Sequence, residues 1–166
     1  MFTLQLRLIS LFVAIALLWG CASPRSSIPE TYQGPTATIR DSARSETAGR
    51  VDFFFVSEID STKIRTSLEA AREFSYGKGD MIAGFAIDRK VPARMVRLKL
   101  EGRRAYGAPI QEILNAATMF HVERVIELNV EPGAYYIVLG SLGPEGSEVW
   151  IEDFATRERV GKQVSP

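Results

Sequence analysis

Short segments in which apolar and polar side chains alternate determine the class of fold open to this chain. The clearest are residues 94–101, which would bury Leu98 and Leu100, and residues 120–130, which would bury Val122 and Ile126. Shorter candidate strands are residues 36–40, 51–59, 62–65, 81–87, 134–139, 148–154 and 159–164, with residues 41–50 as a polar connection and short helices at 67–74 and 110–117. No long helix separates the strands, which excludes a parallel α/β sheet. The prediction is an all-β fold, mainly an antiparallel β-sandwich of about eight or nine short strands with one or two short helices.

Composition narrows the function classes. The 166 residues include 20 basic and 20 acidic side chains, one cysteine and one histidine. A nucleic-acid partner needs a clustered cationic excess, which balanced charge does not supply. One cysteine excludes a disulfide within the chain, and one cysteine with one histidine excludes the usual zinc sites. We therefore expect no nucleic-acid partner, no metal site and no cofactor.

The first twenty residues are typical of an export signal. Arg7 is their only charged side chain, and Ser10 is the only polar residue between positions 8 and 19. A short positive region followed by an apolar run predicts a signal helix, residues 1–20, ahead of the β-domain. The run is too short to cross a bilayer comfortably, because a spanning helix needs about 20 apolar residues.

The apolar run ends at Leu18, Trp19, Gly20 and Cys21, which resembles the lipobox of bacterial lipoproteins. The resemblance implies that signal peptidase II cuts between Gly20 and Cys21 and that Cys21 carries acyl chains such as palmitate. Trp19 stands where a small or β-branched residue is usual. Ordinary secretion with cleavage after Ala22, or an uncleaved anchor, are the alternatives.

The resemblance also implies a location. In the enterobacterial lipoproteins an aspartate after the lipidated cysteine retains the protein in the inner membrane, whereas this chain has Ala22. The expected location is therefore the cell outer membrane of a Gram-negative bacterium, with the chain lipid-anchored through Cys21 and facing the periplasm.

The domain organisation follows from a change in composition after Cys21. Residues 21–35 hold three prolines and few apolar side chains, so we expect a lipidated cysteine with a flexible linker. Residues 36–166 are the expected β-sandwich domain. Residues 132–138, Pro-Gly-Ala-Tyr-Tyr-Ile-Val, resemble the Pro-Gly-x-Tyr hairpin of transthyretin-like modules, and the whole chain is similar to uncharacterised bacterial lipoproteins with a small β-domain. That family supplies no catalytic residues.

One group of side chains suggests a contact site. Glu148, Trp150 and Glu152 would share a strand face, and acidic groups beside an aromatic ring are typical of carbohydrate sites. The sole histidine, His121, lies on the more polar face of a predicted strand, and no Gly-x-Ser-x-Gly motif accompanies it. Since no complete catalytic set can be assembled, we expect a non-enzymatic binding or structural module that contacts another envelope protein or cell-wall glycan. The alternative is a small envelope hydrolase that acts on glycan through the carboxylates near Trp150.

The remaining charged motifs favour structural roles. Lys78 lies between two glycines without the spacing of a phosphate-binding loop. Asp52 and Glu58 are six residues apart with no calcium-binding loop between them. Arg103 and Arg104 form a small basic spot, which we expect to be solvated.

Overall fold

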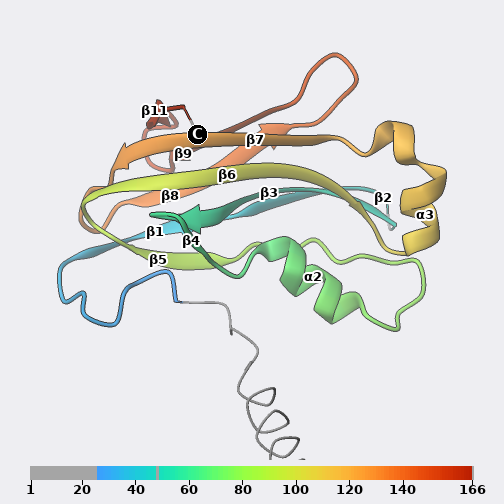
Figure 1. Ribbon diagram of the computed structural model, residues 1–166, viewed down its shortest axis with the longest axis horizontal. Coiled ribbons are helices and arrows are strands. Elements are labelled where there is room, and N and C mark those ends of the chain that lie inside the picture. The colour runs from blue at the N-terminus through green and yellow to red at the C-terminus, as the bar shows by residue number, and fades with distance from the viewer. Residues whose placement is uncertain (1–25, 48, 166) are drawn as a thin grey trace, which may run out of the picture.

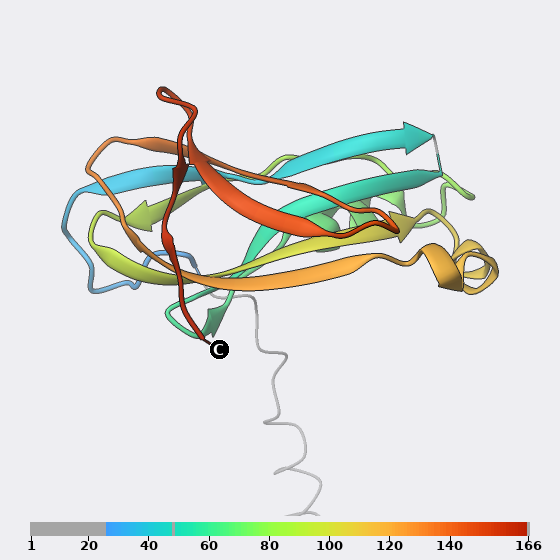
Figure 2. The ribbon, with the colours of Figure 1, turned by 90° about the horizontal axis from the view of Figure 1, so that it is seen from above.

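Two β-sheets packed face to face make up the fold in the computed structural model, which describes residues 26–47 and 49–165 (Figures 1 and 2). The elements are β1 (Thr36–Arg40), β2 (Ser42–Thr47), β3 (Arg50–Ile59), β4 (Thr62–Lys63), α2 (Ser67–Ser75), β5 (Asp88–Pro92), β6 (Met95–Tyr106), α3 (Pro109–Leu114), a 3-10 turn (Ala116–Thr118), β7 (His121–Asn129), β8 (Tyr135–Ser141), β9 (Glu148–Asp153), β10 (Arg159–Val160) and β11 (Lys162–Gln163). The prediction of an all-β sandwich with short helices is confirmed. The predicted signal peptide, with Gly20 and Cys21, lies outside the described residues.

Between β1 and β11 the chain passes from one sheet to the other five times, and two of these crossings take a single residue. One sheet has the order β10-β9-β8-β1-β5, and the other has the order β11-β7-β6-β3-β2 with β4 paired to β3. The two single-residue crossings are the first, at Asp41 between β1 and β2, and the last, at Gly161 between β10 and β11. Gly161 has a φ of 86°, a conformation that favours glycine. The crossing at Gly161 joins the edge strands of the two sheets and so closes one side of the sandwich.

Most strand pairs are antiparallel, with one exception. β1 runs parallel to β8, with Ile39 opposite Tyr136, while its other neighbour β5 is antiparallel. The long pairing of β3 with β6 and of β6 with β7 gives the second sheet its rigid centre.

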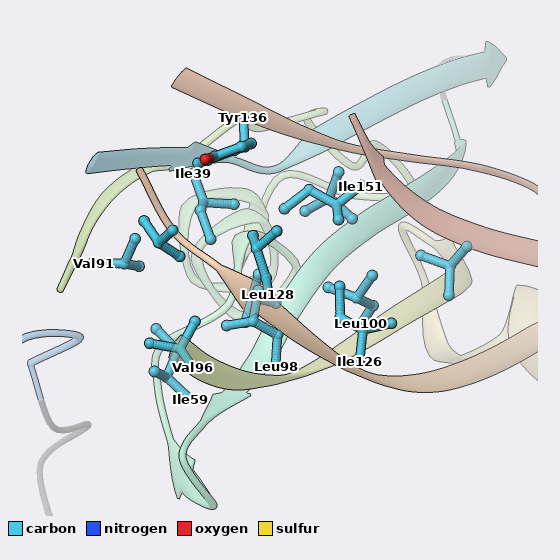
Figure 3. Close-up of a cluster of buried hydrophobic side chains, with 14 of the residues drawn as sticks. Ile39, Ile59, Val91, Val96, Leu98, Leu100, Ile126, Leu128, Tyr136 and Ile151 are labelled. Atoms are coloured by element: carbon cyan, nitrogen blue, oxygen red, sulfur yellow. The ribbon is translucent and has the colours of Figure 1, made fainter. Parts of the chain in front are cut away.

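The main core lies between the two sheets and is built from the alternating positions (Figure 3). Leu98, Leu100 and Ile126 are buried as predicted, whereas Val122 is only partly buried and packs at the margin of the cluster. Val122 is the second residue of β7 and packs over its cross-strand partner Gly102, where an added Cβ would lie 2.9 Å from a Val122 methyl group.

A second apolar layer covers the outer face of β3. Phe53 and Phe55 point to that face and pack with Leu68 and Ala71 of α2. Helix α2 begins with a capping box, in which Thr66 accepts from the Glu69 backbone and Glu69 accepts from the Thr66 backbone. The prediction of a central strand covered on two sides is therefore confirmed for residues 51–59.

Several short segments differ from the sequence prediction. The polar connection at 41–50 contains β2, whose side chains are mostly exposed because it is an edge strand. Residues 81–87 form no strand, and residues 88–92 form β5, an edge strand whose charged and proline content hides its alternation. The single strand expected at 159–164 is two short strands in different sheets, because Gly161 turns the chain between them.

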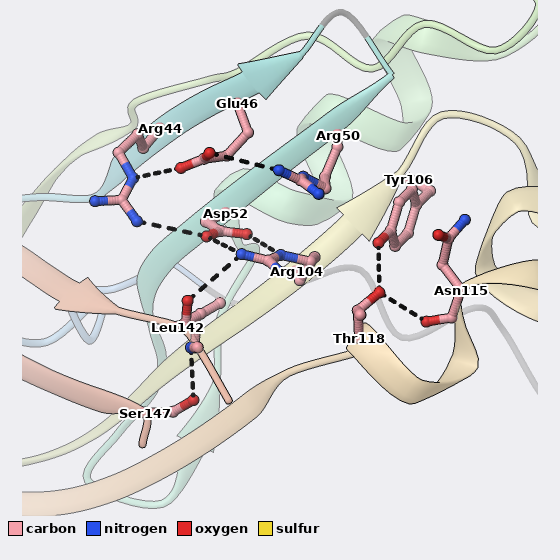
Figure 4. A network of polar contacts seen from close by, with 11 residues as sticks. Arg44, Glu46, Arg50, Asp52, Arg104, Tyr106, Asn115, Thr118, Leu142 and Ser147 are labelled. Carbon is pink, nitrogen blue, oxygen red and sulfur yellow. Dashed lines mark hydrogen bonds and ion pairs between the residues drawn. The ribbon is translucent and has the colours of Figure 1, made fainter. Parts of the chain in front are cut away.

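Two buried ion pairs lie in the fold. Arg89 on β5 pairs with the fully buried Asp41 at the first crossing, and the other carboxylate oxygen of Asp41 accepts from the Val56 backbone N–H at 3.2 Å. On β3, Asp52 accepts two hydrogen bonds from Arg104, at 2.7 and 2.8 Å (Figure 4). Arg104 was expected to be solvated. It is buried instead, because its position on β6 is directly opposite Asp52.

The segment before β1 contacts the sandwich. The Ser27 hydroxyl donates to the Lys90 carbonyl at 2.6 Å, and the Tyr32 hydroxyl donates to the Pro35 carbonyl at 2.7 Å. Residues 26–30 lie beside Ile64, just before α2, and beside Pro92 at the end of β5. The chain therefore enters the folded region on the side that carries α2 (Figure 1).

Candidate functional site

The three contact residues predicted from the sequence share one face of β9. Glu148, Trp150 and Glu152 are partly exposed, and Val149 and Ile151 between them are buried in the main core. The alternation of the strand thus produces the surface strip that the sequence predicted.

The side chains of this strip are engaged with one another and with two arginines. Trp150 donates its indole N–H to Glu152 at 2.7 Å, and the Arg159 guanidinium carbon lies 3.9 Å from the centre of the Trp150 ring. Arg159 also pairs with Glu148 at 2.9 Å, and Arg124 approaches the same carboxylate at 3.7 Å. A sugar ring stacking on that face of Trp150 would have to displace Arg159. Arg159 was not predicted from the sequence, because its position follows from the pairing of β9 with β10.

A second polar cluster lies on the outer surface of β6 and β7. Glu101 and Glu123 are directly opposite each other, and the His121 Nε2 atom lies 3.6 Å from Glu101 and 3.3 Å from Glu123. Lys99 donates to Glu123 at 3.0 Å, and this hydrogen bond raises the pKa of Lys99. The sequence placed His121 on the polar face of its strand, and the side chain is 42% exposed.

This cluster has the donor atoms to hold a metal ion. One atom from each of Glu101, His121 and Glu123 lies within 4.8 Å of the others. Lys99 already neutralises part of the acidic charge, and exposed groups of this kind compensate one another without an ion. The cluster is therefore interpreted as a surface of mixed charge and not as a metal site.

The exposed apolar face of helix α3 was not expected from the sequence. Ile110, Ile113 and Leu114 have the helical spacing that the sequence indicated, and Pro109 occupies the first turn. These three apolar side chains are 57%, 71% and 77% exposed, and no residue of α3 is buried. The apolar face of the helix has no partner within the described residues.

More exposed apolar side chains lie in the last turn of α2 and in the loop after it. Phe74 is 55%, Tyr76 is 89% and Met81 is 57% exposed. The Lys78 amine lies 3.3 Å from the centre of the Phe74 ring, a cation–π contact, and the edge of Phe85 packs against the same ring.

These two groups of side chains belong to one end of the molecule. Arg72 of α2 pairs with Glu112 of α3 at 3.0 Å, so the two helices are adjacent. Both views show α3 and the loop after α2 at the same end of the sandwich (Figures 1 and 2). We call this surface the apolar end, and its members are Phe74, Tyr76, Met81, Ile110, Ile113 and Leu114.

A groove of about 480 Å³ separates the two parts of the apolar end. Its walls are formed by Arg72, Ser75, Glu112 and three glycines together with Tyr76, Ile82, Tyr106 and Pro109. The groove surface is therefore more apolar than polar, and five of the six members of the apolar end, all except Tyr76, lie outside its lining.

The helices in the described part of the chain are all too short or too polar to cross a membrane. Comparison with protein-family models, with curated proteins and with solved structures finds no match to this chain. The candidate sites therefore depend on their geometry alone.

Proposed function

We propose that this chain is a lipid-anchored cell-envelope protein that acts as a non-enzymatic binding or structural module. Cys21 would hold it in the outer membrane, with the β-sandwich facing the periplasm. The lipobox-like Leu18, Trp19, Gly20 and Cys21 support the anchor. The contact of Ser27 with Lys90 supports a short connection between that anchor and the sandwich.

The apolar end is the observation that carries the binding role. Six large apolar side chains, each more than half exposed, lie on the last turn of α2, the loop after it and α3. Exposed apolar patches of this kind mark interaction sites, because leaving them in water is unfavourable unless a partner covers them. The partners proposed for the protein are the membrane through Cys21 and another envelope protein or cell-wall glycan.

The contacts around Trp150 favour binding over catalysis. A general acid on glycan needs a carboxyl group free to exchange a proton with the substrate. Glu148 is paired with two arginines, and Glu152 accepts from the Trp150 indole. Hydrolysis of peptidoglycan that disappeared in Glu148→Gln would instead favour the alternative, a small envelope hydrolase.

The anchor is tested by Cys21→Ser in the full chain. Wild type should incorporate a palmitate analogue and partition with outer membranes, because the thiol accepts the diacylglyceryl group. Cys21→Ser should lose the label and retain the uncut signal, and a blot would show a slightly larger species.

Ser23→Ala is the matched control, since it removes a neighbouring hydroxyl and keeps the thiol. Free periplasmic wild-type protein with an unmodified amino terminus at Ser23 would instead mean ordinary secretion after Ala22.

A further inference from the structure

We propose that the apolar end contacts the lipid surface in which Cys21 is anchored. The folded region then lies against the membrane surface and is not held away from it at the end of the tether. This inference rests on the lipid anchor proposed above. The occupant of the apolar end is the bilayer interface, not a protein groove or a second copy of the chain.

The short connection between Cys21 and the sandwich limits where the folded region can be. Ser26 follows Cys21 by five residues, and five extended residues span at most about 18 Å. The side of the sandwich on which Ser26 lies must therefore stay close to the lipid headgroups. That side carries residues 26–30, Ile64 and Pro92.

Helix α2 connects this side to the apolar end. It begins at Ser67, three residues after Ile64, and its last turn leads into Tyr76. Figure 1 shows residues 26–35, α2 and the loop after α2 along the same lower side of the molecule. A lipid surface near Ser26 therefore lies alongside α2 and reaches Phe74, Tyr76 and Met81.

The chemistry of the apolar end fits a bilayer interface. Tyr76 presents an aromatic ring with a polar tip, and the Lys78 amine lies over the Phe74 ring, where its charge can meet headgroups. Ile113 and Leu114 add aliphatic side chains from α3 that would enter the upper acyl region.

The shape of the apolar end argues for lipid over protein. Most of the apolar side chains project outward beside the groove and not into it, with Tyr76 89% and Leu114 77% exposed, and the ion pair between Arg72 and Glu112 occupies the groove wall. A protein ligand buries its anchors in a concave apolar pocket. A fluid interface accepts separate side chains without shape complementarity.

The test places a nitroxide on the lipidated full chain in vesicles of phosphatidylethanolamine and phosphatidylglycerol. Ile113→Cys carries the label in the apolar end, and Glu145→Cys carries it in the exposed turn between β8 and β9, on the side of the molecule away from α2 (Figure 1). Lipidated Cys21, the only other cysteine, has no free thiol. Collision with oxygen, which concentrates in lipid, is compared with collision with a water-soluble nickel chelate.

We expect the oxygen-to-nickel ratio to be several-fold higher at position 113 than at position 145. Adding Ile110→Asp and Leu114→Asp should bring position 113 to the value of the control, whereas Met95→Asp, at an exposed apolar site on β6, should leave it unchanged.

Equal, aqueous ratios at the two positions, with palmitate incorporation intact, would overturn this inference and leave the anchor in place. Absence of the palmitate label would overturn both. Spin–spin broadening at position 113 that persists in detergent would make a second copy the occupant and would also overturn the inference.

Discussion

Asp41 is the residue whose surroundings say most about how the two sheets are joined. It is fully buried where the chain crosses from β1 to β2, and its carboxylate binds the Val56 backbone N–H and Arg89. Arg89 also donates to the Arg65 carbonyl at 3.0 Å, just before α2. One carboxylate therefore links the first sheet, the second sheet and the connection to α2.

The ionisation of Asp41 should appear in the pH dependence of stability. Burial raises the pKa of Asp41 from 3.8 to about 6, because the loss of hydration outweighs the opposing charge of Arg89. The folded state then binds a proton more tightly than the unfolded chain. The resulting stabilisation is present below pH 3.8 and is lost as the pH rises through about 6.

The change Asp41→Asn removes this titration. The difference in unfolding free energy between wild type and Asp41→Asn should fall by about 3 kcal/mol between acid and neutral pH, at about 1.4 kcal/mol per pKa unit. Urea unfolding at a series of pH values measures it, and Asp88→Asn, half exposed on β5, is the control. A pH-independent difference would mean that folding leaves the pKa of Asp41 at its unfolded value.

At the scale of elements, β6 is the central strand of the second sheet. It pairs with β3 on one side and β7 on the other, and its inward side chains Val96, Leu98 and Leu100 are fully buried or nearly so. Truncating one of them leaves a cavity that strands held by ladders on both sides cannot close.

Leu98→Ala should therefore lower the free energy of unfolding by about 2–5 kcal/mol. Met95→Ala on the same strand should change it by less than about 0.5 kcal/mol, since Met95 is 55% exposed. Urea denaturation of both variants measures the difference. Equal effects would mean that the two residues have similar surroundings, against the burial described for β6.

The sequence predicts a residue's surroundings where they depend on the residues next to it in the chain. It does not predict them where they depend on a residue far away in the chain. The strand β6 and the two-sided cover of β3 follow from alternation and from an aromatic, β-branched run. The burial of Arg104 depends on Asp52 across the sheet, and the arginine above Trp150 comes from β10. The local sequence pattern predicts neither the register of β3 with β6 nor that of β9 with β10.

Helix α3 shows the same limit on the functional side. Ile110, Ile113 and Leu114 gave a correct prediction of a helix, yet periodicity indicates only that a helix has an apolar face. What covers that face is decided by the tertiary structure, and here the sandwich leaves it exposed. The candidate surface around Glu148 was found from the sequence, whereas the apolar end was not.

At the scale of the whole molecule, the proposed lipid anchor and the apolar end differ greatly in their affinity for a membrane. A single myristoyl chain binds membranes with a constant of only about 10⁴ M⁻¹, and the two or three chains of a mature lipoprotein make attachment lasting. The apolar end offers six partly exposed side chains, and association alone must offset a loss of translational and rotational freedom of about 4–15 kcal/mol. Balanced charge, 20 basic against 20 acidic groups, adds little electrostatic attraction.

The contact of the apolar end should therefore depend on the anchor. A tether of a few residues gives the domain a local concentration on the order of millimolar at the lipid surface, which populates a contact too weak to form from solution. The lipidated chain should sediment with vesicles and remain bound in high salt, because its attachment is apolar. A chain exported by a cleavable signal with Cys21→Ser should stay in the supernatant at the same lipid concentration. Sedimentation of that unlipidated chain with vesicles would show that the apolar end binds membranes on its own, and release of the lipidated chain by salt would show that charge, not acyl burial, holds it.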